Sequence, residues 1–105
     1  MKKNKINGTK YKPRISIFRS NKEIYVQIID DINKNTILSY SSLEEKKKNN
    51  KKLTKIQISK IIGEKIAYKM LKKNIYKAFF DRKFYIYHGR IKELIENIRK
   101  KGIKI

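Results

Sequence analysis

The spacing of apolar residues changes once along this chain of 105 residues. Between residues 14 and 42 they recur at every second position, and beyond Thr54 they recur at every third or fourth position. A period of two is typical of a strand with one buried face, and a period between three and four is typical of a helix with one buried stripe. The change therefore predicts strands first and helices afterwards, in an α/β layer structure.

Three strands are predicted in the first part of the chain. They span Arg14–Ser20, residues 23–30 and Thr36–Ser42. The short polar segments SNKE and DINKN join them, so we expect an antiparallel meander. Period two places one set of polar and aromatic side chains on the face away from the core: Ser16, Phe18, Tyr25 and Gln27.

Two helices follow from the later apolar spacing. The first has its buried stripe at Ile58, Ile62, Ile66 and Met70, and the second has it at Ile91, Leu94, Ile95 and Ile98. Gly63 costs a helix about 1 kcal/mol relative to Ala, which favours a close packing contact at that position. Gly102 stands where a glycine commonly ends a helix.

Three remaining segments complete the predicted fold. Ile75–Phe80 is predicted as a buried fourth strand, and residues 103–105 as a short terminal strand. Leu43–Lys52 is a charge run, expected to form an exposed loop or the frayed start of a helix without a specific contact. The predicted order is β-β-β-α-β-α, a single small α/β domain with a mixed sheet and helices packed on one face. Residues 1–12 are predicted to be a flexible basic arm, and residues 13–105 the domain.

The net charge of +20 is distributed unevenly. Residues 1–22 hold eight Lys or Arg and no acidic residue, whereas residues 23–45 hold one Lys and five acidic residues. Lys, Ile and Asn have A- and T-rich codons, so genomic bias explains part of the lysine excess but not the scarcity of acidic residues. Such a charge on a small domain favours a polyanionic partner. We expect no membrane span, because no run of about 18 uncharged apolar residues occurs, and no targeting segment.

The sequence holds few residues suited to catalysis or to metal binding. Paired catalytic metal ions need converging carboxylates, and the candidates Asp30, Asp31 and Asp81 show no pattern that brings them together. His88 is the only His and there is no Cys, so no zinc site is recognisable. We therefore predict neither an enzyme nor a cofactor, metal or small-molecule substrate, which counts against a nuclease.

Aromatic and basic residues alternate in two segments, FRSNKEIY and FDRKFYIYHGR. Aromatic rings stack on exposed bases, and Arg makes bidentate contacts with phosphate or guanine. Rings that only fill the sheet are the alternative explanation, which we favour for Tyr68, Phe79 and Phe80. Gly89 lets the backbone turn or approach closely, and the amides of the following helix can meet phosphate. A basic DNA-compacting protein is the rival hypothesis, but it predicts an even spread of charge.

Four segments carry a resemblance to a known family: PRISIFRSNKEIYVQIIDD, SSLEEK, IIGEKIA and FDRKFYIYHGRIKELIENIRKKGI. Together they resemble the bacterial-type ribosomal protein L-eighteen family, from about Ile6 to Ile105. The resemblance implies a ribonuclease H-like motif without its catalytic carboxylates. It also implies binding of 5S rRNA and its attachment to 23S rRNA in the central protuberance, beside ribosomal protein L-five and neighbouring proteins. The ribosome would be that of an AT-rich bacterium or of an organelle with its own genome.

The chain departs from the family pattern in three ways. Lys83-Phe84 stands where small residues are usual, the basic arm is shorter, and Lys largely replaces Arg. The retained arginines are therefore the strongest site candidates, because Lys lacks the bidentate fork. We expect Arg14, Arg19 and Lys22 to grip phosphates near the first hairpin. The complete predicted RNA-binding set is Lys12, Arg14, Phe18, Arg19, Ser20, Asn21, Lys22, Tyr25, Gln27, Ser42, Arg82, Tyr87, His88, Gly89 and Arg90.

Overall fold

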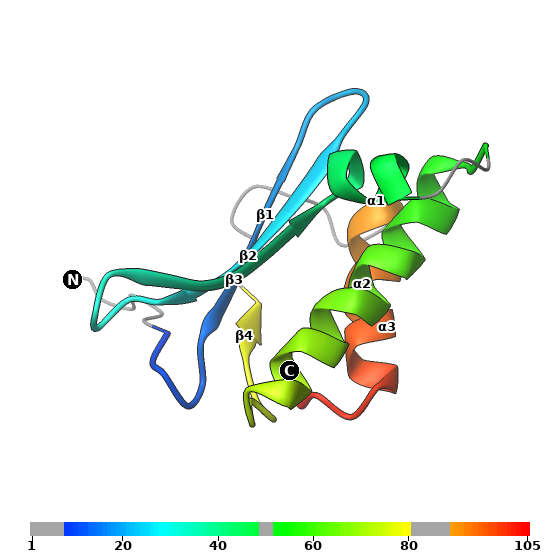
Figure 1. Cartoon of the computed structure of the whole chain (residues 1–105). Helices are drawn as coiled ribbons and strands as arrows, with labels where there is room; N and C mark the ends of the chain where they lie inside the picture. The colour runs from blue at the N-terminus through cyan, green and yellow to red at the C-terminus, as the bar shows by residue number, and fades with distance from the viewer. Residues whose placement is uncertain (1–7, 49–51, 81–88) are drawn as a thin grey trace.

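The computed structural model describes residues 8–48, 52–80 and 89–105 (Figure 1). Its elements in chain order are β1 (Arg14–Arg19), β2 (Ile24–Asp30), β3 (Asn35–Ser41), α1 (Ser42–Lys48), α2 (Lys55–Lys72), β4 (Phe79–Phe80) and α3 (Gly89–Lys100). This is the predicted small α/β domain with one additional helix, α1. The first three strands begin and end within one residue of their predicted bounds.

The four strands form one mixed sheet in the order β3-β2-β1-β4. β1, β2 and β3 pair antiparallel as the predicted meander, and β4 pairs parallel to β1. Ile15 lies opposite Ile28, and Ile17 lies opposite Val26, so these side chains share one face of the sheet and are buried there. The alternation of the sequence thus fixes which face becomes the core.

Helices α2 and α3 cover that face side by side (Figure 1). All the apolar residues of the two predicted stripes are buried in one core. α2 begins with a capping box, in which Thr54 accepts the Gln57 amide and the Gln57 side chain accepts the Thr54 amide. These reciprocal bonds satisfy two amide groups that a helix start leaves without partners.

Gly63 lies where α2 packs closely against α3, as predicted. A Cβ atom at this position would lie 2.5 Å from the carbonyl oxygen of Leu94 and 3.0 Å from the Cβ of Asn97. Only a glycine leaves room for the backbone of α3 at this distance. The helix-weakening residue is therefore explained by helix packing.

The prediction that residues 43–52 make no specific contact is wrong for α1. The helix begins after Ser41, whose hydroxyl oxygen accepts the Glu44 amide at 3.3 Å. Glu45 is buried, accepts a hydrogen bond from the Tyr40 hydroxyl at 2.9 Å and pairs with Lys65 at 3.1 Å. These contacts anchor the charge run to β3 and α2.

The predicted fourth strand is shorter than expected. Asn74 has a positive φ of 61°, and the Ile75 amide still bonds to Met70 as α2 ends, so the segment cannot start as a strand at Ile75. The amide of Ala78 then bonds to the carbonyl of Lys104, and β4 proper comprises only Phe79–Phe80. The predicted terminal strand is reduced to a single parallel bridge between Lys77 and Lys104.

Candidate nucleic-acid interface

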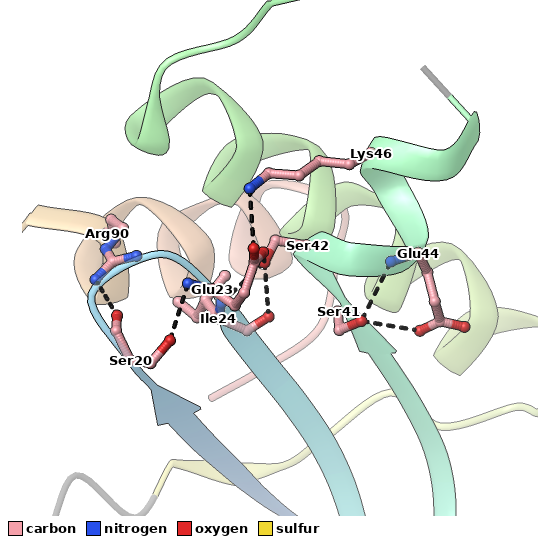
Figure 2. Close-up of polar contacts among 8 residues, drawn as sticks. All are labelled: Ser20, Glu23, Ile24, Ser41, Ser42, Glu44, Lys46 and Arg90. Atoms are coloured by element: carbon pink, nitrogen blue, oxygen red, sulfur yellow. Dashed lines mark hydrogen bonds and ion pairs between the residues drawn. The ribbon is translucent and has the colours of Figure 1, made fainter. Parts of the chain in front are cut away.

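The tip of the first hairpin lies against the start of α3 (Figure 2). The turn between β1 and β2 is closed by the Ser20 amide, which donates to the Glu23 carbonyl at 2.9 Å, and by the Glu23 amide, which donates to the Ser20 hydroxyl at 3.1 Å. The Arg90 guanidinium donates to the Ser20 carbonyl at 3.1 Å. The two segments that were singled out in the sequence, 70 residues apart, therefore meet in space.

Arg90 is half-buried and links α3 to the hairpin. A guanidinium has five N–H donors, so its bond to Ser20 leaves donor capacity for a phosphate. Arg90 can thus both position the hairpin and contact a ligand.

Glu23 organises the support beneath this contact (Figure 2). Its carboxylate accepts a 2.5 Å hydrogen bond from the Ser42 hydroxyl and pairs with the Lys46 ammonium at 3.1 Å. Ser42 in turn accepts the Ile24 amide at 2.9 Å. The Ser42 hydroxyl, and after it Lys46, hold the pKa of Glu23 below its usual value, although burial acts in the opposite direction.

A depression of about 240 Å³ opens beside this network. It is bordered by four cationic side chains, those of Lys22, Lys46, Lys55 and Arg90, over an apolar floor that includes Ile24 and Ile58. One carboxylate, Glu23, compensates Lys46. The surplus positive charge suits an anionic group that approaches from solvent.

The start of α3 adds to the positive potential here. Gly89 begins the helix with a φ of +59° and is exposed. Apart from its chain neighbours and its own helix, no atom of the described residues lies within 4 Å of where its Cβ would be. The first turn of α3 carries no acidic residue that would neutralise the helix dipole. The first backbone amides can therefore approach a phosphate oxygen.

The face of the sheet away from the helices carries the predicted polar and aromatic set. Phe18 lies opposite Tyr25, and Ser16 lies opposite Gln27, in two adjacent rows. Phe18 is 52% exposed and Tyr25 is 36% exposed. Two neighbouring rings that are open to solvent can stack on bases or pack on riboses.

Some predicted site residues are placed apart from this surface. Arg14 lies five residues from the tip along β1, about 17 Å, and its guanidinium binds both oxygens of Asp31 at 2.9 Å. Asp31 also accepts the buried Gly8 amide at 2.6 Å, so this pair ties the preceding chain to the sheet. Lys12 is exposed, with its ammonium 4.2 Å from the centre of the Phe79 ring.

The remaining predicted residues fall into three groups. Arg19, Asn21 and Lys22 are exposed at the hairpin tip. Ser42 is only 2% exposed, and its hydroxyl is engaged inside the fold. Arg82, Tyr87 and His88 lie outside the described residues.

Glu23, Lys46 and Lys55 were not among the predicted site residues. Lys46 belongs to the charge run that was predicted as an exposed loop or the frayed start of a helix. The pattern Ser41-Ser42-Leu43-Glu44 is a capping-box signature that signals the start of α1. It could have placed Lys46 one turn into a helix beside the hairpin.

The fold and this surface define a class of protein. Among the described residues, no helix is long and apolar enough to cross a membrane, and no three metal-binding side chains gather in one place. The chain forms a strongly basic α/β domain, with cations around a depression beside the first hairpin and exposed rings on the face of the sheet away from the helices. This is the class of structural nucleic-acid-binding domains.

Comparison with known proteins identifies the family within this class. Residues 2–105 match the model of ribosomal L18 of archaea, bacteria, mitochondria and chloroplasts. The chain is 46% identical over 100 residues to large ribosomal subunit protein uL18 of Clostridium botulinum, covering 95% of this chain and 82% of that protein. It is 48% identical over 103 residues to protein uL18c of Gracilaria tenuistipitata, covering 97% and 98% of the two chains. The chain therefore belongs to the ribosomal L18 family.

Membership of this family confirms the predicted family and class of function. The protein is a structural ribosomal constituent and not an enzyme, and its partners include ribosomal RNA and other ribosomal proteins.

Proposed function

We propose that this protein binds 5S rRNA and helps attach it to 23S rRNA in the central protuberance of the large ribosomal subunit. Its protein neighbours there would be ribosomal protein L-five and other proteins of the protuberance. The ribosome is in the bacterial cytoplasm or in an organelle with its own genome. The observation that carries the proposal is the meeting of the hairpin tip and the start of α3 around a cationic depression.

Each part of the surface has a role in this proposal. Arg19, Asn21 and Lys22 contact phosphates from the hairpin tip. Arg90 and the first amides of α3, with His88 and Gly89 just before them, hold the RNA backbone. Phe18 and Tyr25 take bases or riboses on the open sheet face, with Gln27 beside them.

Other predicted residues serve the interface indirectly. We assign Ser42 to the support of the hairpin, because its buried hydroxyl is already shared between Ile24 and Glu23. Arg14 secures the chain before β1 through Asp31. Its distance from the hairpin tip separates it from the phosphates that Arg19 and Lys22 would bind.

Titration of 5S rRNA with the full chain tests the proposal. Arg90→Ala should weaken binding by about 1–3 kcal/mol, the range for a lost Arg contact. Arg90→Lys should recover part of the loss, because it keeps the charge without the planar fork. Arg99→Ala, at the other end of the same helix, is the matched control and should bind normally. Circular dichroism must show folded protein for each variant.

Two results would contradict the proposal. Equal binding of 5S rRNA and duplex DNA of the same length at physiological salt would favour the compaction hypothesis. If the protein neutralises six to ten phosphates, raising the salt concentration from 50 to 200 mM should weaken its binding to RNA by about 10³–10⁵-fold. Binding that is indifferent to salt would remove the electrostatic basis.

A further inference from the structure

A second basic surface lies on the C-terminal half of α2. A hollow of about 660 Å³ is lined there by five lysines and one ring: Lys48, Lys65, Lys69, Lys72, Lys101 and Tyr68. Glu64 is the one acidic residue among its described lining. We name this surface the α2 basic face.

Several lysines of the α2 basic face make contacts that fix the position of their ammonium groups. The ammonium groups of Lys48 and Lys69 lie 5.3 and 5.0 Å from the centre of the Tyr40 ring, which is buried beneath them. Lys65 pairs with Glu45 and is therefore largely compensated. The face consequently has a surplus of positive charge contributed by α1, by α2 and by Lys101, which directly follows α3.

Tyr68 gives this face a chemistry beyond charge. Its ring is 60% exposed, and the ammonium of Lys72 lies 4.9 Å from the ring centre. An exposed ring beside cations suits an unpaired base, which stacks on the ring while its phosphates meet the ammonium groups. An acidic protein segment would use the lysines but would leave the ring without a planar partner.

The α2 basic face is separate from the hairpin surface. Lys55 borders the first depression and Lys69 borders the second. Fourteen residues of one helix separate them, which corresponds to about 21 Å along its axis. A phosphate bound at Lys69 therefore cannot also contact Lys55, although the two surfaces come closer at α1, where Lys46 borders the first and Lys48 borders the second.

We propose that the α2 basic face binds a second, single-stranded RNA segment, with one base stacked on Tyr68 and phosphates on Lys69, Lys72 and Lys101. The choice of RNA as the partner rests on the function proposed above. The prediction that the Tyr68 ring only fills the sheet is wrong, because Tyr68 lies on α2 and is 60% exposed. A protein with two such surfaces can hold two RNA segments at once.

The test uses the full chain and an oligouridylate of ten nucleotides that carries 5-iodouridine. Irradiation should crosslink the probe to Tyr68, as mapped by mass spectrometry. Tyr68→Leu keeps an apolar side chain but removes the ring, and it should lose this crosslink and bind about 5- to 150-fold more weakly. Tyr68→Phe should bind like the original protein. A crosslink that avoids Tyr68, or normal binding by Tyr68→Leu, would overturn the proposal.

The lysines are tested by a matched pair of double variants. Lys69→Gln with Lys72→Gln should lower the salt slope of oligouridylate binding by about 1.4, since each contact on a single strand contributes about 0.7. Lys77→Gln with Lys104→Gln removes the same charge from exposed positions off both surfaces and should change the slope less. If both double variants lower the salt slope equally, oligouridylate binding depends only on the total charge, and the proposed site is wrong.

The two proposals fail in distinguishable ways. Arg90→Ala should weaken 5S rRNA binding but leave the crosslink at Tyr68 intact. If Arg90 matters for 5S rRNA while no crosslink forms at Tyr68, the proposed function stands and the second site is wrong. If the crosslink forms while 5S rRNA binds no better than duplex DNA, the second site stands and the choice of 5S rRNA is wrong.

Discussion

The hydroxyl of Ser42 accepts the Ile24 amide and donates to the Glu23 carboxylate, so a single oxygen joins β2 to α1. Removing it leaves a buried amide without a partner, which costs about 1–3 kcal/mol. We therefore expect Ser42→Ala to lower the free energy of unfolding by that amount in urea denaturation. Ser39→Ala, at an exposed position of β3, is the matched control and should change it by less than about 0.5 kcal/mol. Equal effects would show that the Ser42 bonds contribute nothing specific.

The Ser42 hydroxyl also makes the free energy of unfolding depend on pH. In the folded protein the Ser42 hydroxyl and Lys46 lower the pKa of Glu23 below the ordinary value of 4.5. The unfolded chain then binds this proton more readily, so the stabilisation is complete above about pH 4.5 and is lost as the pH falls through the lowered pKa. Unfolding measured from pH 7 to pH 3 should show this loss, and Ser42→Ala should make it smaller. An acid transition that is identical in both proteins would contradict this role of Ser42.

At the scale of elements, Gly63 makes the packing of α2 on α3 testable. Alanine favours a helix by about 1 kcal/mol over glycine, yet its Cβ would come within 2.5 Å of the Leu94 carbonyl oxygen. Overpacking of this kind costs about 1–3 kcal/mol or more, and here the neighbour is backbone that cannot rotate away. Gly63→Ala should therefore lower the melting temperature, whereas Glu64→Ala, one residue on and exposed, should not. A stabilised Gly63→Ala protein would mean that the helices can separate at little cost.

Elements with a strong apolar period could be predicted from the sequence. The alternation around Ile17 and Val26 predicted strands correctly, and the two apolar stripes that include Ile66 and Leu94 predicted α2 and α3 correctly, because burial of one face is encoded locally. The face that carries Phe18 and Tyr25 follows from the same alternation.

Elements that depend on distant contacts could not be predicted in this way. α1 was predicted only as an exposed loop or the frayed start of a helix, because the contacts of Glu45 are with Tyr40 and Lys65, which come from other elements. Likewise, the contact of Arg90 with Ser20 joins segments 70 residues apart, and the local spacing of apolar residues cannot predict such a contact. The candidate site was therefore predicted as two separate segments, and its assembly required the fold.

On the scale of the whole molecule, a net charge of +20 is confined to a domain with a radius of gyration of 13.4 Å. Such a surplus destabilises the compact state through self-repulsion, which salt screens. A polyanion that binds only the folded state stabilises it further by mass action. The free protein should therefore melt at a lower temperature at low ionic strength than at physiological ionic strength, and RNA should raise the melting temperature again.

A charge-reduced variant separates repulsion from other effects of salt. Lys34→Asn, Lys77→Gln and Lys104→Gln remove three positive charges at exposed positions, and Asn suits the positive φ of 52° at residue 34. If self-repulsion limits stability, the triple variant should melt at a higher temperature than the original protein at 10 mM salt. The difference should shrink at 300 mM salt, where the Debye length falls to a few ångströms. Scanning calorimetry at both salt concentrations measures this directly. Equal melting temperatures at 10 mM salt would show instead that the charges are already compensated within the fold, and a difference that does not depend on salt would come from the new side chains rather than from charge.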